Sequence, residues 1–88
     1  MILTREQERV LEAIYNLAGG APTVQVPINS IHGAFFAMDV SDLVRHLLLL
    51  LDSGFIKNAV PSREKLGNYY FLTPEGILYY RRISDQKS

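Results

Sequence analysis

The hydrophobic spacing of the chain changes at Gly54, and this change limits the folds that are open to it. In residues 41–53, just before the glycine, leucines recur at the three- and four-residue spacing of one helix face. After the glycine, residues 55–60 and 69–72 are rich in β-branched and aromatic residues and have the length of strands. The polar residues 61–68 between them have turn formers at both ends, which predicts a β-hairpin with a long loop. The chain therefore combines helices with a small sheet.

The N-terminal half of the chain predicts two further helices. The first spans residues 5–18, with Thr4 as its N-cap, a capping-box glutamine three residues later and a pair of glycines at its end. The second carries apolar residues on one face and takes Asn29 or Ser30 as its N-cap. Residues 21–28, between these helices, contain two prolines, which cannot donate to a ladder and therefore allow at best a short edge strand.

Capping residues predict the remaining boundaries. The third helix, over residues 41–53, is expected to be capped by Ser41, and a turn of about three residues joins it to the second helix, which is the spacing of a helix-turn-helix. A fourth helix begins with Thr73 as N-cap and Pro74 at the first helical position, and residues 84–88 are expected to fray. All 88 residues are therefore expected to form one mainly helical α+β domain.

Composition narrows the classes of function. The chain holds no cysteine, which excludes a disulfide framework, a thiolate zinc site and an iron–sulfur cluster. Nine basic and nine acidic residues give a net charge of zero, which excludes a strongly cationic nucleic-acid-binding chain but leaves room for a local basic patch. The apolar run at residues 47–51 is far shorter than the ~20 residues of a membrane span, and the N-terminus lacks a signal-peptide pattern. We therefore expect a cytoplasmic location and no membrane contact.

Catalytic and metal-binding arrangements are not expected. The two histidines, His32 and His46, are accompanied by no cysteine and by no carboxylate pair at ligand spacing, whereas a metal site needs three or four ligands. The serines have no nucleophile-elbow sequence around them, and a domain this small encloses a substrate pocket with difficulty. The sequence therefore predicts no enzymatic activity, no cofactor and no bound metal.

Two motifs resemble those of a known family. They are Leu43, Leu47 and Leu50 running into Gly54-Phe55-Ile56, and the segment Tyr70-Phe71-Leu72-Thr73-Pro74-Glu75-Gly76. The first is similar to a recognition helix that leads into a wing, and the second to the Y-x-L-T-x-x-G pattern at the exit from the wing. With the element order, they resemble the winged-helix superfamily over residues 4–83, and in particular small MarR-like and PadR-like bacterial and archaeal transcription regulators. The resemblance implies a three-helix core with a helix-turn-helix, a hairpin wing and a C-terminal helix.

The resemblance also implies a transcription regulator that binds double-stranded DNA, and we expect it to act as a homodimer. The helix over residues 41–53 would enter the major groove, and the loop 61–68 would form the wing. Residues 1–56 hold three basic and six acidic residues, whereas residues 57–88 hold six basic and three acidic ones, so the positive part contains the wing. The residues expected to contact DNA are Ser41, Arg45, Arg63, Lys65 and Asn68.

The outer face of the expected recognition helix departs from that pattern. Leu48 and Leu49 lie where polar side chains usually read base edges, and Asp42 and Asp52 would meet phosphates unfavourably. Three explanations are open for the leucines: contact with thymine methyl groups, a subunit or partner interface, or burial on more sides than is usual. We favour an interface, because a helix with two apolar faces in a small domain needs another surface to cover it.

The last helix predicts the same kind of contact. Ile77 and Tyr80 suffice for its core face, which leaves Leu78 and Tyr79 as the expected contacts of a homodimer. The alternative to DNA binding is a winged-helix module that binds another protein through the leucines of the third helix.

Overall fold

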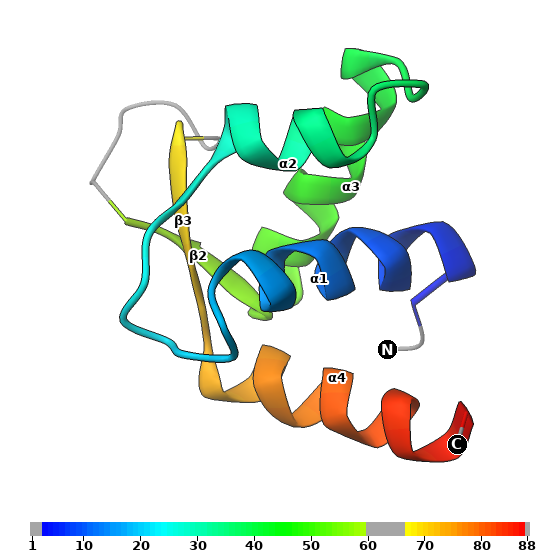
Figure 1. The fold of residues 1–88 in the computed structure, drawn as a ribbon, viewed down its shortest axis with the longest axis vertical. Helices are drawn as coiled ribbons and strands as arrows, with labels where there is room; N and C mark the ends of the chain where they lie inside the picture. The colour runs from blue at the N-terminus through cyan, green and yellow to red at the C-terminus, as the bar shows by residue number, and fades with distance from the viewer. Residues whose placement is uncertain (1–2, 60–66, 88) are drawn as a thin grey trace.

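The computed structural model describes residues 3–59 and 67–87, which contain four helices and three strands. Along the chain these are α1 (Arg5–Leu17), β1 (Val26–Pro27), α2 (Ile28–Ala34), α3 (Val40–Asp52), β2 (Ile56–Asn58), β3 (Tyr69–Leu72) and α4 (Pro74–Lys87). In Figure 1 the sheet lies along one side of the molecule, α1, α2 and α3 pack beside it, and α4 lies below α1. The predicted mainly helical α+β class is confirmed.

The prediction for the first helix is confirmed at both ends to within one residue. The Thr4 N–H donates to Gln7 Oε1 at 2.9 Å, and the Gln7 N–H donates to Thr4 Oγ1 at 3.3 Å, which completes the capping box. Gly19 and Gly20 end the helix with φ values of 63° and 73°, which glycine adopts without strain. The Gly20 N–H donates to the Tyr15 carbonyl at 2.9 Å and so satisfies one of the last helical carbonyls.

α2 begins earlier than the sequence predicts. Pro27 occupies its N-cap position and makes no side-chain capping hydrogen bond. The Ile28 N–H donates to the Asn68 carbonyl at 2.9 Å, so the pairing of β1 with β3 runs directly into the first helical residue. The prediction of Asn29 or Ser30 as N-cap is therefore wrong, and both residues lie exposed in the first turn.

α3 begins one residue before the predicted cap. The N–H groups of Asp42 and Leu43 donate to the Asp39 carbonyl at 3.1 and 3.0 Å, so the backbone enters the helix at Asp39. Ser41 lies exposed in the first turn instead of at the N-cap, and this prediction is wrong. The turn between α2 and α3 is five residues long, two more than predicted, because α2 is a short helix of seven residues.

The strands form an antiparallel sheet in the order β1-β3-β2, and β1 is the short edge strand that the two prolines predict. Along β3, Tyr70 and Leu72 are buried in the core, while Tyr69 and Phe71 alternate onto the outer face. Lys57 of β2 pairs with Phe71, and its Nζ lies 5.7 Å from the centre of that ring. The second strand of the predicted hairpin is confirmed over Tyr69–Leu72, and the first is shorter than the predicted residues 55–60, spanning Ile56–Asn58, with residue 60 outside the described residues.

α4 starts as predicted and runs further than predicted. The Gly76 N–H donates to Thr73 Oγ1 at 3.1 Å, which confirms Thr73 as the N-cap. A Cβ on Gly76 would lie 2.1 Å from the carbonyl oxygen of Phe55, so α4 approaches the start of the hairpin as closely as only glycine permits. The helix continues to Lys87, beyond Ser84, where the sequence predicts that it frays, and residues 84–86 are exposed.

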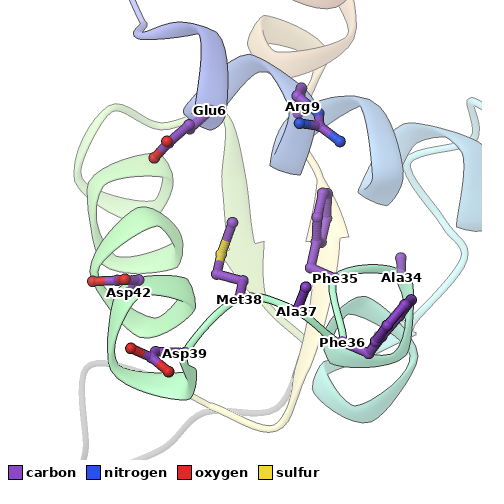
Figure 2. Close-up of a pocket in the computed structure, with 9 residues that line it drawn as sticks. All are labelled: Glu6, Arg9, Ala34, Phe35, Phe36, Ala37, Met38, Asp39 and Asp42. Atoms are coloured by element: carbon purple, nitrogen blue, oxygen red, sulfur yellow. The ribbon is translucent and has the colours of Figure 1, made fainter.

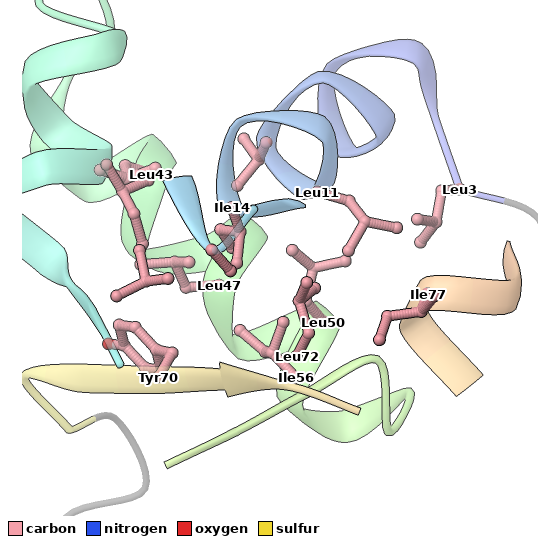
Figure 3. Close-up of a cluster of buried hydrophobic side chains, with 14 residues drawn as sticks. Leu3, Leu11, Ile14, Leu43, Leu47, Leu50, Ile56, Tyr70, Leu72 and Ile77 are labelled. Atoms are coloured by element: carbon pink, nitrogen blue, oxygen red, sulfur yellow. The ribbon is translucent and has the colours of Figure 1, made fainter. Parts of the chain in front are cut away.

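The core is one cluster between the sheet and the helices (Figure 3). Its buried members are Leu3, Val10, Leu11, Ile14, Ala18, Val26, Ile31, Leu43, Leu47, Leu50, Ile56, Tyr70, Leu72 and Ile77. The hydroxyl of Tyr70 donates to the Gly67 carbonyl, and burial of this side chain raises its pKa to about 12. Tyr15 and Tyr80 stack with ring centres 4.3 Å apart and hold α4 against α1.

Candidate nucleic-acid interface

The outer face of α3 carries the residues that the sequence predicts for base reading. The leucines of the opposite face are buried, which fixes the rotation of the helix about its axis. Ser41, Arg45, Leu48 and Asp52 follow one another at helical spacing along the outer face. Ser41, Arg45 and Asp52 are exposed, and Leu48 is half-buried. The face is therefore a polar stripe with one leucine in it.

Arg45 already has a partner within the helix. Its guanidinium forms an ion pair with the carboxylate of Asp42, three residues earlier, and the two side chains are 75% and 43% exposed. Exposed pairs of this kind contribute about 0–1 kcal/mol, because both charges remain largely solvated. A ligand that offers Arg45 a better acceptor can therefore replace Asp42 at small cost.

The predicted wing residues divide between the described and the undescribed parts of the chain. Arg63 and Lys65 lie outside the described residues. Asn68 is exposed just before β3. The ends of the loop are held together, because the Ala59 N–H donates to the Tyr69 carbonyl and the Gly67 N–H donates to Asn58 Oδ1, both at 2.9 Å.

The two leucines of α3 that were expected on the outside are both half-buried. Leu49 packs against the core, which agrees with burial of α3 on more sides than is usual. Both leucines line a hollow of about 580 Å³ together with Glu6 and Gln7 at the start of α1. An interface through Leu48 and Leu49 stays a prediction.

The two predicted contacts on α4 have different environments. Leu78 is 61% exposed and is available to another surface. Tyr79 is used inside the domain: its hydroxyl accepts the Leu3 N–H at 2.9 Å, and its ring lies 4.7 Å from that of Phe55. The expectation that Tyr79 is surplus to the core is therefore wrong, because the aromatic contact with Phe55 was not visible in the spacing of α4.

A second hollow, of about 510 Å³, lies between α1 and the turn from α2 to α3 (Figure 2). Phe35 and Met38 are half-buried in its wall, and the carboxylates of Glu6, Asp39 and Asp42 surround it with one cation, that of Arg9. Its excess of negative charge makes this side of α3 unfavourable for phosphate. The Ser41–Arg45 stripe is not free of acidic groups either, because Asp42 and Asp52 line the hollow beside it together with Arg45.

The turn beside this hollow holds a residue that the sequence reasoning missed. Phe36 is 86% exposed, the most exposed of the large apolar side chains in the described part of the chain. It lies in the wholly apolar run 34–38, which the sequence predicts as part of the second helix, so no exposed turn is expected there. α2 ends at Ala34, so the rest of the run lies in a turn, and this early end of the helix leaves Phe36 exposed.

Within residues 3–59 and 67–87, no three His, Cys, Asp or Glu side chains lie close enough together to hold a metal ion. The same residues contain no helix with the length and apolar character of a membrane span.

The fold is similar to that of a solved structure. The crystal structure of the reduced form of MarR from E. coli superimposes on 96% of this chain with a TM-score of 0.68 and 23% sequence identity. The match covers 56% of the MarR chain, so this chain spans little more than half the length of that protein. No protein-family model matches the sequence, and no curated protein matches it. The predicted winged-helix fold is confirmed, and it is the fold of MarR.

Proposed function

We propose that this protein is a transcription regulator that binds double-stranded DNA, with α3 in the major groove and the loop 61–68 as the wing. The observation that carries the proposal is the exposed Ser41–Arg45 stripe on α3, in a MarR-like fold whose hairpin follows this helix directly. A helix of this kind fits the major groove, and side chains on its outer face meet base edges.

Arg45 is the proposed base reader. Its planar guanidinium matches the O6 and N7 acceptors of guanine, and its ion pair with Asp42 is weak enough to be exchanged for them. Ser41, one turn earlier on the same face, is the proposed partner to the neighbouring base or phosphate. Asp42 and Asp52 restrict the DNA sequences that α3 accepts. A carboxylate accepts a hydrogen bond from cytosine N4, and it repels the acceptor atoms that other bases present in the major groove.

The wing supplies the sequence-independent part of the affinity. Arg63, Lys65 and Asn68 are proposed to contact phosphates, the first two by charge and the third by hydrogen bonding. Because the chain carries no net charge, these local charges decide whether DNA is attracted at all.

We further propose a homodimer whose main contact is Leu78. Two copies related by a twofold axis would present two α3 helices to half-sites about 34 Å apart. Tyr79 lies beside Leu78 and supports this face of α4 through its contact with Phe55. An interface through Leu48 and Leu49 is incompatible with this arrangement, because a partner that covers these residues would keep α3 out of the major groove.

Fluorescence anisotropy with a labelled random-sequence duplex tests the proposal. Arg45→Ala is expected to weaken binding about tenfold, and the Arg63→Ala/Lys65→Ala variant to weaken it and to lower the salt slope by about 2. Arg82→Ala, which removes an exposed arginine from α4, is the matched control and should bind as the wild type does. Equal affinities for all four proteins would contradict the assigned surface.

The oligomeric state is tested separately by sedimentation. Leu78→Asp is expected to give a monomer, whereas Val24→Asp, at another exposed apolar residue far from α4 in sequence, should leave the dimer intact. If instead Leu48→Asp abolishes association while Leu78→Asp has no effect, the protein-binding alternative replaces the proposal.

A further inference from the structure

A third hollow, of about 320 Å³, lies where the edge of the sheet meets the first turn of α2. We call it the amide hollow, because two of its five lining residues are asparagines; the lining residues are Pro27, Ile28, Asn29, Asn68 and Tyr69. It is open to solvent, and none of its lining residues among residues 3–59 and 67–87 is charged. It is distinct from the hollow of about 510 Å³ that Glu6, Asp39 and Asp42 surround beside α1.

The backbone fixes the two asparagines beside each other. The Ile28 N–H donates to the Asn68 carbonyl at 2.9 Å, so Asn29 follows directly after a residue that is bonded to Asn68. The pairing of Pro27 with Tyr69 in the sheet holds the same junction from the other side. Because hydrogen bonds hold both segments in place, binding a ligand here costs little conformational entropy of the backbone.

The polar groups of the amide hollow are available. Asn29 and Asn68 are exposed, and Tyr69 is 44% exposed on the outer face of β3. None of these three side chains makes a hydrogen bond within the part of the chain that the structure describes. Two primary amides and a phenol therefore offer several N–H and O–H donors to one small space.

We propose that the amide hollow binds a backbone phosphate of the duplex that α3 reads, with the side chains of Asn29, Asn68 and Tyr69 as neutral donors to its oxygens. This inference rests on the proposed DNA-binding function. Asn68 belongs to the proposed wing, so the strand that meets the wing passes next to the hollow. Neutral amides and hydroxyls are common phosphate contacts, and they fix the register of a protein on DNA without reading sequence.

Neutral donors have a signature that charged residues lack. A lysine or arginine that contacts a phosphate releases condensed counterions and steepens the dependence of affinity on salt. An amide releases none, so its removal lowers affinity by a similar factor at every salt concentration. The amide hollow therefore adds affinity that persists at high salt, which suits a chain with no net positive charge.

The test is an anisotropy titration of a labelled random-sequence duplex at several salt concentrations. Asn29→Ala, Asn68→Ala and Tyr69→Phe are each expected to weaken binding about three- to tenfold with an unchanged salt slope. Asn29→Lys should tighten binding at low salt and steepen the slope by about 1. Asn16→Ala, which removes an exposed amide from α1, is the matched control and should have no effect. Thermal unfolding of each variant checks that the fold is kept.

The outcomes separate this inference from the proposed function. If the wild type binds DNA and the three variants bind equally well, the amide hollow is not a phosphate site and Asn68 is not a wing contact, while DNA binding through Arg45, Arg63 and Lys65 stands. If Asn16→Ala weakens binding as much as Asn29→Ala does, the effect is not specific to the hollow and the inference fails. If the wild type binds no duplex at any salt, the proposed function fails first and the inference with it.

Discussion

The two ends of this domain differ in how they use similar residues. At the end where α4 meets α1, Tyr79 and Tyr80 are both held by aromatic partners and Gly76 admits the backbone of Phe55. At the end where α2 meets the hairpin, Tyr69 is exposed and Gly33 has nothing within 4 Å of the Cβ that it lacks. The residues of the first end therefore stabilise the fold through their contacts, whereas the second end keeps polar side chains accessible to a ligand. Substitutions of the glycines and of the exposed and bonded tyrosines test this difference, and the buried Tyr70 between the two ends tests the core that joins them.

The largest expected effect comes from the two glycines. Gly76→Ala should destabilise the fold by about 3 kcal/mol or more, because its Cβ would overlap the Phe55 carbonyl and push α4 away. Gly33→Ala should instead stabilise it by about 0.5–1 kcal/mol, because this glycine is within α2 and its Cβ meets no neighbour. Urea unfolding of both variants measures the difference. A similar decrease in the free energy of unfolding for both variants would show that the two ends do not differ in packing.

Alkaline pH should weaken the domain through Tyr70. Its pKa is raised from 10.0 to about 12 by burial, so the folded state holds the proton more tightly than the unfolded chain does. The resulting stability is present below pH 10 and is lost as the pH rises towards 12, by an amount on the order of 2 kcal/mol. Tyr70→Phe removes the titrating group, so its stability should fall less steeply over that range. If the free energy of unfolding fell equally with pH in both proteins, the titration of Tyr70 would not be the cause of the loss.

The smallest effect separates two tyrosines. Tyr79→Phe should cost about 1 kcal/mol, because the Leu3 N–H loses its acceptor in a partly buried position. Tyr69→Phe should leave the free energy of unfolding unchanged within about 0.5 kcal/mol, because its hydroxyl has no partner among the described residues. Thermal unfolding of both variants resolves the difference. A larger loss for Tyr69→Phe would show that this side chain is structural.

Local signals predicted most of the fold. The capping box at Thr4, the glycine stop after α1 and the threonine cap of α4 are each decided by a few neighbouring residues, and all three are confirmed. The starts of α2 and α3 could not be read in the same way. The start of α2 depends on a hydrogen bond from Ile28 to Asn68, forty residues away, which no local pattern contains.

The candidate site was predictable in outline only. The helical spacing of α3 placed Ser41 and Arg45 together on one face, and the structure agrees. The ion pair that Arg45 makes with Asp42 depends on the choice of rotamer, and the amide hollow depends on the meeting of two segments that are distant in sequence. The hollow arises from tertiary packing, so the sequence proposes Asn68 through the wing but carries no local sign that Asn29 lies beside it.

The most direct test of the account is the affinity of the unmodified chain for a random-sequence duplex, measured by anisotropy from low to physiological salt. The account predicts micromolar binding that weakens as the salt concentration rises, because wing phosphate contacts supply the sequence-independent part of the affinity. Absence of binding even at the lowest salt would contradict it, and would mean that this winged helix does not use its α3 stripe and wing on DNA.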